Sequence, residues 1–350
     1  MNRRGIAVAA LFAFALVANR SVLADDAHAD DRSVAVIVVV GAPGSTDYGE
    51  QFAAWAARWK EAAQRGRAQF IGIGPLDANE KTQTVSTPDG NANGEPSDRD
   101  KLRRAIEQIA KTDGAAIGQT WIVLIGHGTF DGKRAKFNLR GPDVTAEELA
   151  EWLQPVETPL AVVNCASSSG PFINRLSAAK RVIVTATKSG YQYNFARFGD
   201  YLSAAIGEAA ADLDKDQQTS LLEAYLAASA RTAEFYDQAS RLATEHALLD
   251  DNGDALGTPA DFFRGSRAVR AAKTGAAPDG QLAARFVLVR GEQESAMPAE
   301  LAARRDAIEE RIENLRSRKT TLAEQEYYSR LEALLLELAA CYEEAETEAK

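Results

Sequence analysis

The chain contains only three histidines and two cysteines, so any catalysis by these side chains must use very few of them. One of each follows a short apolar run that is typical of a buried strand. Residues 121–126 lead into His127, and residues 160–164 lead into Cys165. A thiol attacks well only as the thiolate, and a neighbouring imidazole favours that form. A single cysteine at a strand end is usually a small buried apolar residue, and a single histidine is usually structural. Because Cys165 and His127 each follow such a strand, together they predict a catalytic pair.

Small residues follow both strand ends. Gly128 leaves room for a substrate carbonyl to approach backbone N–H groups, and residues 166–170 are small where the next helix should begin. The positive end of that helix would also favour a thiolate. The serines at 167–169 lack a G-x-S-x-G elbow, so we interpret them as part of a flexible loop.

Residues 33–205 alternate short apolar runs with amphipathic stretches, as in parallel sheets with right-handed crossover helices on both faces. The predicted fold class is therefore α/β, a doubly wound, mainly parallel sheet of about six strands. Successive strands of such a sheet often pair, so His127 and Cys165 should emerge close together at its carboxyl edge. Strands are expected at residues 33–40, 69–72, 121–126, 160–163 and 181–187, with a sixth returning at 284–289.

The strand ending in His127-Gly128 and the next strand ending in Cys165 resemble the caspase-like, or clan CD, cysteine peptidases, and within them the legumain-type group. Residues 182–187, followed by Phe-Gly-Asp at 198–200, are also similar to the segment after the nucleophile in legumain-type proteins. The resemblance covers roughly half the chain. It implies that Cys165 is the nucleophile, that His127 is the general acid and base, and that the backbone N–H groups of Gly128 and Cys165 form the oxyanion hole.

The chain departs from this family in two places. The family often has Glu-Ala or Gln-Ala before the cysteine and a glycine soon after it, whereas here Val163-Asn164 precede Cys165 and the first following glycine is Gly170. The basic residue that caspases place after the first strand has no counterpart at residues 41–44. The resemblance therefore implies neither caspase-type aspartate specificity nor legumain-type asparagine specificity.

Two acidic segments have the spacing of EF-hand-like calcium loops, in which oxygen ligands occupy alternate positions before a helix. The first set is Asp212, Asp214, Asp216, Ser220 and Glu223, and the second is Asp250, Asn252, Asp254, Thr258 and Asp261. Gln217 and Ala255 stand where a glycine usually allows the sharp turn. We expect calcium to have a structural role, in which it holds the long helix against the sheet domain, and we expect no cofactor for catalysis. The alternative is that the first segment is a solvated helix-capping turn and the second a plain acidic turn.

Composition limits the partners and the compartment. With 40 basic and 50 acidic residues the formal charge is −10, which argues against nucleic-acid binding because that needs a basic surface. Residues 1–24 have the features of a secretory signal peptide: a basic start at Arg3 and Arg4, an apolar run at 6–18 and small residues before a cleavage site near Ala24. We expect an exported protein, periplasmic or secreted, with membrane contact only through an uncleaved signal sequence.

The C-terminal part is predicted to be helical. Residues 221–249 are Ala- and Leu-rich and amphipathic, and residues 298–350 carry apolar residues seven apart at Leu301, Ile308, Leu315 and Leu322. We expect a hairpin of two antiparallel helices there, with coiled-coil packing, that binds its own domain, a second copy or a partner. The expected domains are a signal peptide (1–24), a peptidase core (33–205), a helical insertion with the acidic loops and a returning strand (206–290), and the hairpin (298–350).

These features together predict an exported cysteine endopeptidase that cleaves peptide or protein substrates, or transfers the acyl group to another amine. The alternative is a calcium-stabilised binding or scaffold protein on the same fold, without proteolysis. Reactivity of Cys165 toward peptidyl electrophiles distinguishes the two hypotheses.

Overall fold

The computed structural model describes residues 33–77, 96–112, 117–273 and 277–348. The expected signal peptide and most of the polar segment between 77 and 98 lie outside these residues. Within the described ranges, no helix is both long enough and apolar enough to cross a membrane.

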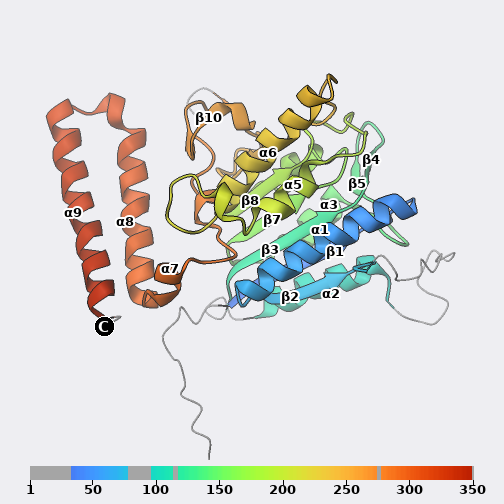
Figure 1. The fold of residues 1–350 in the computed structure, drawn as a ribbon, viewed down its shortest axis with the longest axis horizontal. Coiled ribbons are helices and arrows are strands. Elements are labelled where there is room, and N and C mark those ends of the chain that lie inside the picture. Colours follow the sequence, from blue (N-terminus) through green and yellow to red (C-terminus); the bar gives the residue numbers. More distant parts are fainter. Residues whose placement is uncertain (1–32, 78–95, 113–116, 274–276, 349–350) are drawn as a thin grey trace, which may run out of the picture.

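A six-stranded sheet forms the centre of the molecule (Figure 1). Its spatial order is β2-β1-β3-β7-β8-β9, in which the first five strands are parallel and β9 is antiparallel to β8. The central strands are rich in Val and Ile and buried on both faces, as strands between two helical layers must be. The strands are β1 (Ser33–Val40), β2 (Gln69–Ile73), β3 (Ile117–Ile125), β7 (Leu160–Asn164), β8 (Arg181–Thr185) and β9 (Leu248–Asp250). The predicted mainly parallel α/β sheet is confirmed.

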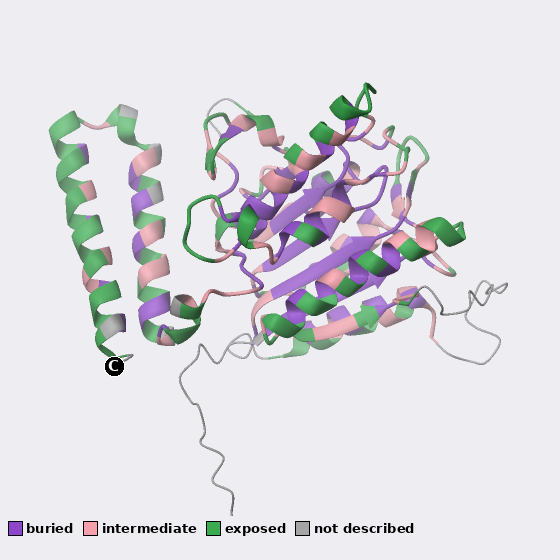
Figure 2. Ribbon diagram, in the orientation of Figure 1, coloured by how far each residue is buried: buried purple, intermediate pink, exposed green. Residues whose placement is uncertain are grey.

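Helices cover both faces of this sheet, and an apolar core lies on each side (Figure 2). One face carries α1 (Thr46–Arg65), α5 (Phe198–Ala205) and α6 (Leu221–Gln238), and the other carries α2 (Asp98–Lys111), α3 (Ala146–Leu153) and α4 (Pro171–Leu176). At the start of α3, Thr145 and Glu148 form a reciprocal capping box that satisfies two backbone N–H groups. The doubly wound arrangement is therefore as predicted.

The sixth strand is β9 and not the expected segment at 284–289. There Ala283–Arg285 form a single 3₁₀ turn, and Val287 makes only an isolated bridge. The Asp251 carboxylate accepts three backbone N–H groups at the start of this segment, each at 2.8 Å, and holds it as a turn. The prediction of a returning strand there was wrong because the backbone of Phe286 and Val287 bonds to Leu221 and Ser220 at the start of α6 and not to a strand of the sheet.

The expected helical stretch at 221–249 is also divided. α6 ends at Gln238, Ser240 has a φ of 50°, and β9 begins at Leu248. His246 therefore lies in a connection and not on a helix. Ala- and Leu-rich composition does not distinguish a helix from a buried strand, so the break was not visible in the sequence.

A small antiparallel sheet directly follows His127 along the chain. It consists of β4 (Gly128–Phe130), β5 (Ala135–Phe137) and β6 (Val144–Thr145). The Asn138 N–H donates to the His127 carbonyl at 3.0 Å. The backbone around His127 is thus fixed by the main sheet on one side and by this sheet on the other. A further pair of short strands, β10 (Phe263–Arg264) and β11 (Arg267–Ala268), lies beyond β9 in the sequence.

Two long helices stand beside the sheet domain (Figure 1). They are α8 (Ala299–Ser317) and α9 (Glu324–Glu348), reached through α7 (Glu292–Ala296), and they share an apolar core of their own. Cys341 is buried in that core and donates to the Leu301 carbonyl at 3.3 Å. Neither cysteine of the chain forms a disulfide.

Candidate active site

Strands β3 and β7 end side by side at the carboxyl edge of the sheet. Leu124 pairs with Asn164, and the Cys165 N–H donates to the Leu124 carbonyl at 2.9 Å. His127 and Cys165 therefore leave neighbouring strands at the edge where open α/β sheets bind their ligands. The edge is the one expected from the sequence, and both side chains lie on the face of the sheet that α1 covers.

The Cys165 side chain lies in the core between β7 and the helices α1 and α5. Only 1% of the residue is exposed. A Cβ placed on Gly199 would stand 3.0 Å from the Cys165 Sγ and 2.8 Å from the Trp55 ring, so little space remains beside the thiol. In the described part of the chain no hydrogen bond joins Cys165 to His127, whose ring bonds to Pro43 instead.

Burial also suppresses the reactivity of this thiol. It raises the pKa of Cys165 to about 12, and the negative charge of Glu245 acts in the same direction. A thiol with such a pKa is almost entirely protonated at neutral pH, whereas attack requires the thiolate. In this arrangement Cys165 packs the core. Attack by Cys165 stays a prediction, and it would require α5 to move off the thiol.

The His127 ring is held by one backbone contact and by aromatic rings. Its Nε2 lies 3.1 Å from the Pro43 carbonyl oxygen, which can only accept, so in this contact Nε2 carries the proton and Nδ1 is unprotonated. The rings of Tyr48, Phe52 and Phe195 lie against it, with centroids at 4.9, 5.2 and 6.2 Å. His127 is thus oriented as a base that acts through Nδ1.

The protonation state of His127 suits that role. Burial lowers its pKa from the ordinary value of 6.5, and the hydrogen bond to the Pro43 carbonyl raises it by a smaller amount. The imidazole is therefore neutral at pH 7, which is the form that accepts a proton from a nucleophile.

The side chain that contacts Gly128 is Ser167 and not Cys165. The Gly128 N–H donates to the Ser167 Oγ at 3.3 Å, and the hydroxyl lies 3.3 Å from the Gly128 carbonyl oxygen, to which it donates. A Cβ on Gly128 would lie 2.2 Å from the Ser167 carbonyl oxygen, so only glycine permits this approach. The N–H group expected to bind an oxyanion thus faces a serine hydroxyl.

Residues 167–169 form a buried turn and not the flexible loop expected. Ser168 has a φ of 55°, which is uncommon for a residue other than glycine, and its buried hydroxyl has no partner among the described residues. The Ser169 and Thr187 hydroxyls lie 3.1 Å apart. A strained turn between a strand and a helix often accompanies a functional site, so these serines are candidates that the sequence motifs did not single out.

The loop that follows β8 lies against the serine turn. The Ser168 N–H donates to the Gln192 carbonyl at 2.8 Å. Tyr191 and Tyr193, on either side of Gln192, are 72% and 75% exposed, and the Tyr191 ring meets Phe130 of β4 at 5.3 Å. Two large aromatic side chains are therefore presented to solvent beside the serine turn.

Glu245 positions the start of α5, which covers Cys165. Its buried carboxylate accepts the N–H groups of Arg197 and Phe198 at 2.8–2.9 Å and the Tyr236 hydroxyl at 3.0 Å. Burial raises the pKa of Glu245, while these hydrogen bonds act to lower it. Nothing in the sequence marks Glu245, because the two N–H groups that it accepts lie 47 and 48 residues away along the chain.

The first acidic loop brings three of its five expected ligands together. Carboxylate oxygens of Asp212, Asp214 and Asp216 lie within 4.8 Å of one another. Ser220 and Glu223 instead form the capping box of α6, and both Glu223 oxygens accept backbone N–H groups. A calcium ion bound by Glu223 would therefore have to displace these bonds.

The second acidic loop is more deeply buried. Asp250 is 1% exposed, and the Asn252 Oδ1 accepts the Asp254 N–H at 2.8 Å. Two other expected ligands differ from the prediction. The Thr258 hydroxyl donates to Asp279 at 2.5 Å, and Asp261 is exposed. Asp279, which lies outside the sequence motif, takes their place beside the loop.

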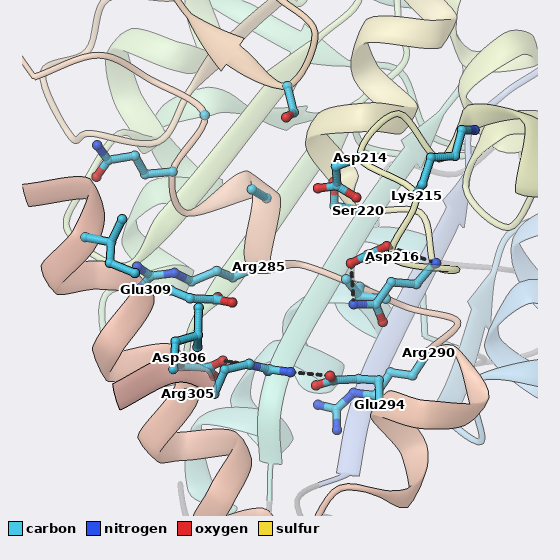
Figure 3. Close-up of a pocket in the computed structure, with 18 of the residues that line it drawn as sticks. Asp214, Lys215, Asp216, Ser220, Arg285, Arg290, Glu294, Arg305, Asp306 and Glu309 are labelled. Carbon is cyan, nitrogen blue, oxygen red and sulfur yellow. Dashed lines mark hydrogen bonds and ion pairs between the residues drawn. The ribbon is translucent and has the colours of Figure 1, made fainter. Parts of the chain in front are cut away.

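A cavity of about 1100 Å³ lies between the first acidic loop and the helical hairpin (Figure 3). Its wall is strongly charged and of mixed sign, and Arg305 pairs there with Glu294 and Asp306. Charged lining residues include Asp214, Asp216, Arg285, Arg290, Arg305 and Glu309. No residue of the β3–β7 edge lines it, so it is separate from the candidate active site.

Comparison with known proteins gives a remote likeness of fold. No protein-family model matches the chain, and no curated protein sequence matches it. Among solved structures, caspase-1 from Spodoptera frugiperda is similar with a TM-score of 0.40 and 10% identity, over 64% of this chain and 88% of that one. The Drosophila initiator caspase Dronc has a TM-score of 0.41 and 13% identity, over 63% of this chain and 80% of Dronc. The structure of drICE has a TM-score of 0.40 and 9% identity, over 65% of this chain and 90% of drICE. Likeness at this level does not assign an activity to the chain.

Proposed function

We propose that the chain is a peptidase-type hydrolase whose reactive centre is the His127–Gly128 turn and whose nucleophile is Ser167. His127 acts as general acid and base, and Cys165 packs beneath the centre. The position of the histidine is the one that the sequence resemblance to caspase-like peptidases implies, whereas the nucleophile differs from that implied by the resemblance.

One observation carries the proposal. The Ser167 Oγ lies 3.3 Å from both the nitrogen and the carbonyl oxygen of Gly128, the residue after His127. The alternative nucleophile, the Cys165 thiol, is enclosed by the core and protonated at neutral pH. Ser167 is itself only 4% exposed, so its hydrogen bonds to Gly128 must open when a substrate carbonyl enters.

The chemistry is an acyl transfer in two steps. The Ser167 Oγ bonds to the substrate carbonyl carbon while its proton passes to His127 Nδ1, and the C–N bond breaks as His127 gives that proton to the leaving amine. The Gly128 N–H, released from Ser167, stabilises the oxyanion of the tetrahedral intermediate. Water then attacks the ester, its proton passes through His127 to Ser167, and the carboxylic acid leaves.

A peptide-library cleavage assay tests this function. Ser167→Ala and His127→Ala should each lower the cleavage rate by about 100-fold or more. Cys165→Ala and the matched variant Ser168→Ala should retain most of the activity of the wild type. Loss of activity in Cys165→Ala with retention in Ser167→Ala would instead establish a cysteine peptidase.

A second candidate function is binding without proteolysis on the same fold. The exposed side chains of Tyr191 and Tyr193 favour it, because exposed aromatic pairs are common in binding surfaces. Absence of cleavage by the wild type, together with retention of a peptide ligand by His127→Ala and its loss in Tyr193→Ala, would support this candidate.

Export of the protein is part of the proposal. It rests on the signal-peptide features of residues 1–24, whose removal takes away three arginines and no acid and so changes the formal charge from −10 to −13. N-terminal sequencing of the protein from the cell exterior or periplasm should find a chain that begins just after Ala24. Recovery of the uncleaved chain from the cytoplasm alone would contradict export.

A further inference from the structure

Asp250 is the most anomalous acidic side chain in the described part of the molecule. The residue is 1% exposed, and neither of its carboxylate oxygens has a hydrogen-bond partner among the described residues. A buried carboxylate without hydrogen bonds or a cation is strongly unfavourable, so such a group is normally paired or bound to a metal. Its position at the end of β9 fixes it between the sheet and the acidic loop that follows.

The charges around Asp250 are of its own sign. The pKa of Asp250 is raised to about 6, mainly by burial and also by the negative charges of Asp279 and Asp254, while the Ser177 hydroxyl and the Gly253 N–H act to lower it. The Asp254 Oδ2 is likewise buried without a partner among the described residues, while its Oδ1 accepts the Leu256 N–H at 2.9 Å. Asp250 and Asp254 therefore contribute three buried carboxylate oxygens that have no hydrogen-bond partner among the described residues.

The neighbouring acidic residue Asp251 does not share this anomaly. Its oxygens accept three backbone N–H groups at 2.8 Å, as a capping carboxylate does. Asp279 is also well bonded, since it accepts N–H groups of Asp251 and Asn252 and the Thr258 hydroxyl. These bonds fix Asp279 beside the loop, and the unsatisfied oxygens belong to Asp250 and Asp254 alone.

We infer that Asp250 and Asp254, backed by the charge of Asp279, hold a hard divalent cation, and that the cation is calcium. Buried carboxylate oxygens without a hydrogen-bond donor suit calcium, which takes six to eight oxygen ligands in flexible geometry. The site differs from the EF-hand pattern, because Asp279 comes from a segment 21 residues beyond Thr258 and Asp261 is exposed. The inference is independent of the identity of the nucleophile.

The cation would join two segments that the sheet alone does not hold. The loop after β9 and the segment around Asp279 already meet through hydrogen bonds to Asp251, Asn252 and Thr258. A positive ion at Asp250 would remove the mutual repulsion of the carboxylates there. Calcium should therefore stabilise the native state, since a ligand that binds only the folded protein raises its stability.

Calorimetric titration of the chelator-treated, full-length protein with CaCl₂ tests the inference. The wild type should bind calcium, and Asp250→Asn should lose one site or weaken it at least tenfold. Asp261→Asn makes the same chemical change at an exposed residue of the same loop and should bind like the wild type. Equal calcium binding by Asp250→Asn and the wild type, or no binding by the wild type at millimolar calcium, would overturn the inference.

Thermal unfolding and a variant of the first acidic loop distinguish loss of the calcium site from loss of the fold. Without calcium, Asp250→Asn should unfold at the same temperature as the wild type or higher, because it loses a buried charge, and millimolar calcium should raise the melting temperature of the wild type only. Asp214→Asn, in the first acidic loop, should leave this site intact. Loss of all calcium binding in Asp214→Asn, with none lost in Asp250→Asn, would place the ion in the first loop and refute the site at Asp250.

Discussion

At the scale of single residues, the alternation along β7 explains why its cysteine is buried. Side chains of a strand point alternately to the two faces of a sheet. Ala161 and Val163 belong to the core beneath α1 and α5, and Cys165 continues that series, whereas Ala166 joins the opposite core. Ser167 is the first polar side chain past the strand end that meets the His127–Gly128 turn. The sequence could not show this, because a run that is apolar on both faces does not reveal which residue faces which helix.

The buried thiol makes a prediction about alkylation. In a Cys341→Ser variant, iodoacetamide should label Cys165 at least about 100-fold more slowly in the folded protein than in denaturant, because a pKa of about 12 leaves almost no thiolate. The rate in the folded state should stay low between pH 7 and 9. Labelling at the rate of a free cysteine would show that the thiol is accessible and would support Cys165 as the nucleophile.

The lowered pKa of His127 predicts the acidic limb of the pH profile. Because the neutral imidazole is the base, kcat/KM should rise as His127 loses its proton, and the lowered pKa places the midpoint below 6.5. More than half of the maximal activity should therefore be present at pH 7. A midpoint above 6.5 in a peptide-cleavage assay would contradict this environment for His127.

At the scale of elements, the sequence predicts the long buried strands well and the short ones poorly. β1, β3, β7 and β8 are runs rich in Val, Ile or Leu that end near glycine or polar residues, so composition identifies them. β9 has only three residues, and its place in the sheet depends on antiparallel pairing with β8, which lies far earlier in the sequence. The same limit applies to the site: the edge that carries His127 follows from the strands, whereas Pro43 and Asp279 reach their positions through contacts between distant segments.

Because α5 approaches β7 closely at Gly199, we predict that substitution of this glycine lowers the stability of the protein, and Gly49 provides a matched control. A Cβ on Gly199 would lie 2.6 Å from the Cys165 Cβ, so Gly199→Ala should destabilise the protein by about 1–3 kcal/mol through overpacking. In α1, a Cβ on Gly49 would contact only Pro43, at 3.6 Å. Because glycine within a helix is less favourable than alanine, Gly49→Ala should stabilise the protein by about 0.5–1 kcal/mol. Denaturant unfolding measures both. Equal effects in the two variants would mean that α5 does not pack on Cys165 as described.

At the scale of the whole molecule, the helical hairpin is tied by ion pairs of unequal burial. Arg305 is 12% exposed and binds Glu294 before α8 and Asp306 within it, whereas Arg304 and Glu344 form an exposed pair. Removing one member of a buried pair leaves its partner uncompensated, so Arg305→Ala should destabilise the hairpin by about 3–5 kcal/mol. Arg304→Ala should have little effect.

Hydrogen exchange locates this effect. Amide protection should fall in α8 and α9 of Arg305→Ala while the protection of the six-stranded sheet stays at the wild-type level. Equal loss of protection in the sheet would mean that the hairpin and the sheet domain unfold as one unit. The exposed apolar side chains of α9, which include Leu336 at 66% exposure, are the expected contact if the hairpin also binds a second copy or a partner.

The proposed mechanism depends on which side chain reacts at the carboxyl edge of β3 and β7. Mass spectrometry of the wild-type protein after treatment with a peptidyl fluorophosphonate identifies that side chain directly, because the adduct stays on the nucleophile. We predict an adduct on Ser167 that is absent in His127→Ala and unchanged in Cys165→Ala. An adduct of a peptidyl thiol-reactive probe on Cys165 of the folded protein, with Ser167 unmodified by the fluorophosphonate, would contradict a serine nucleophile.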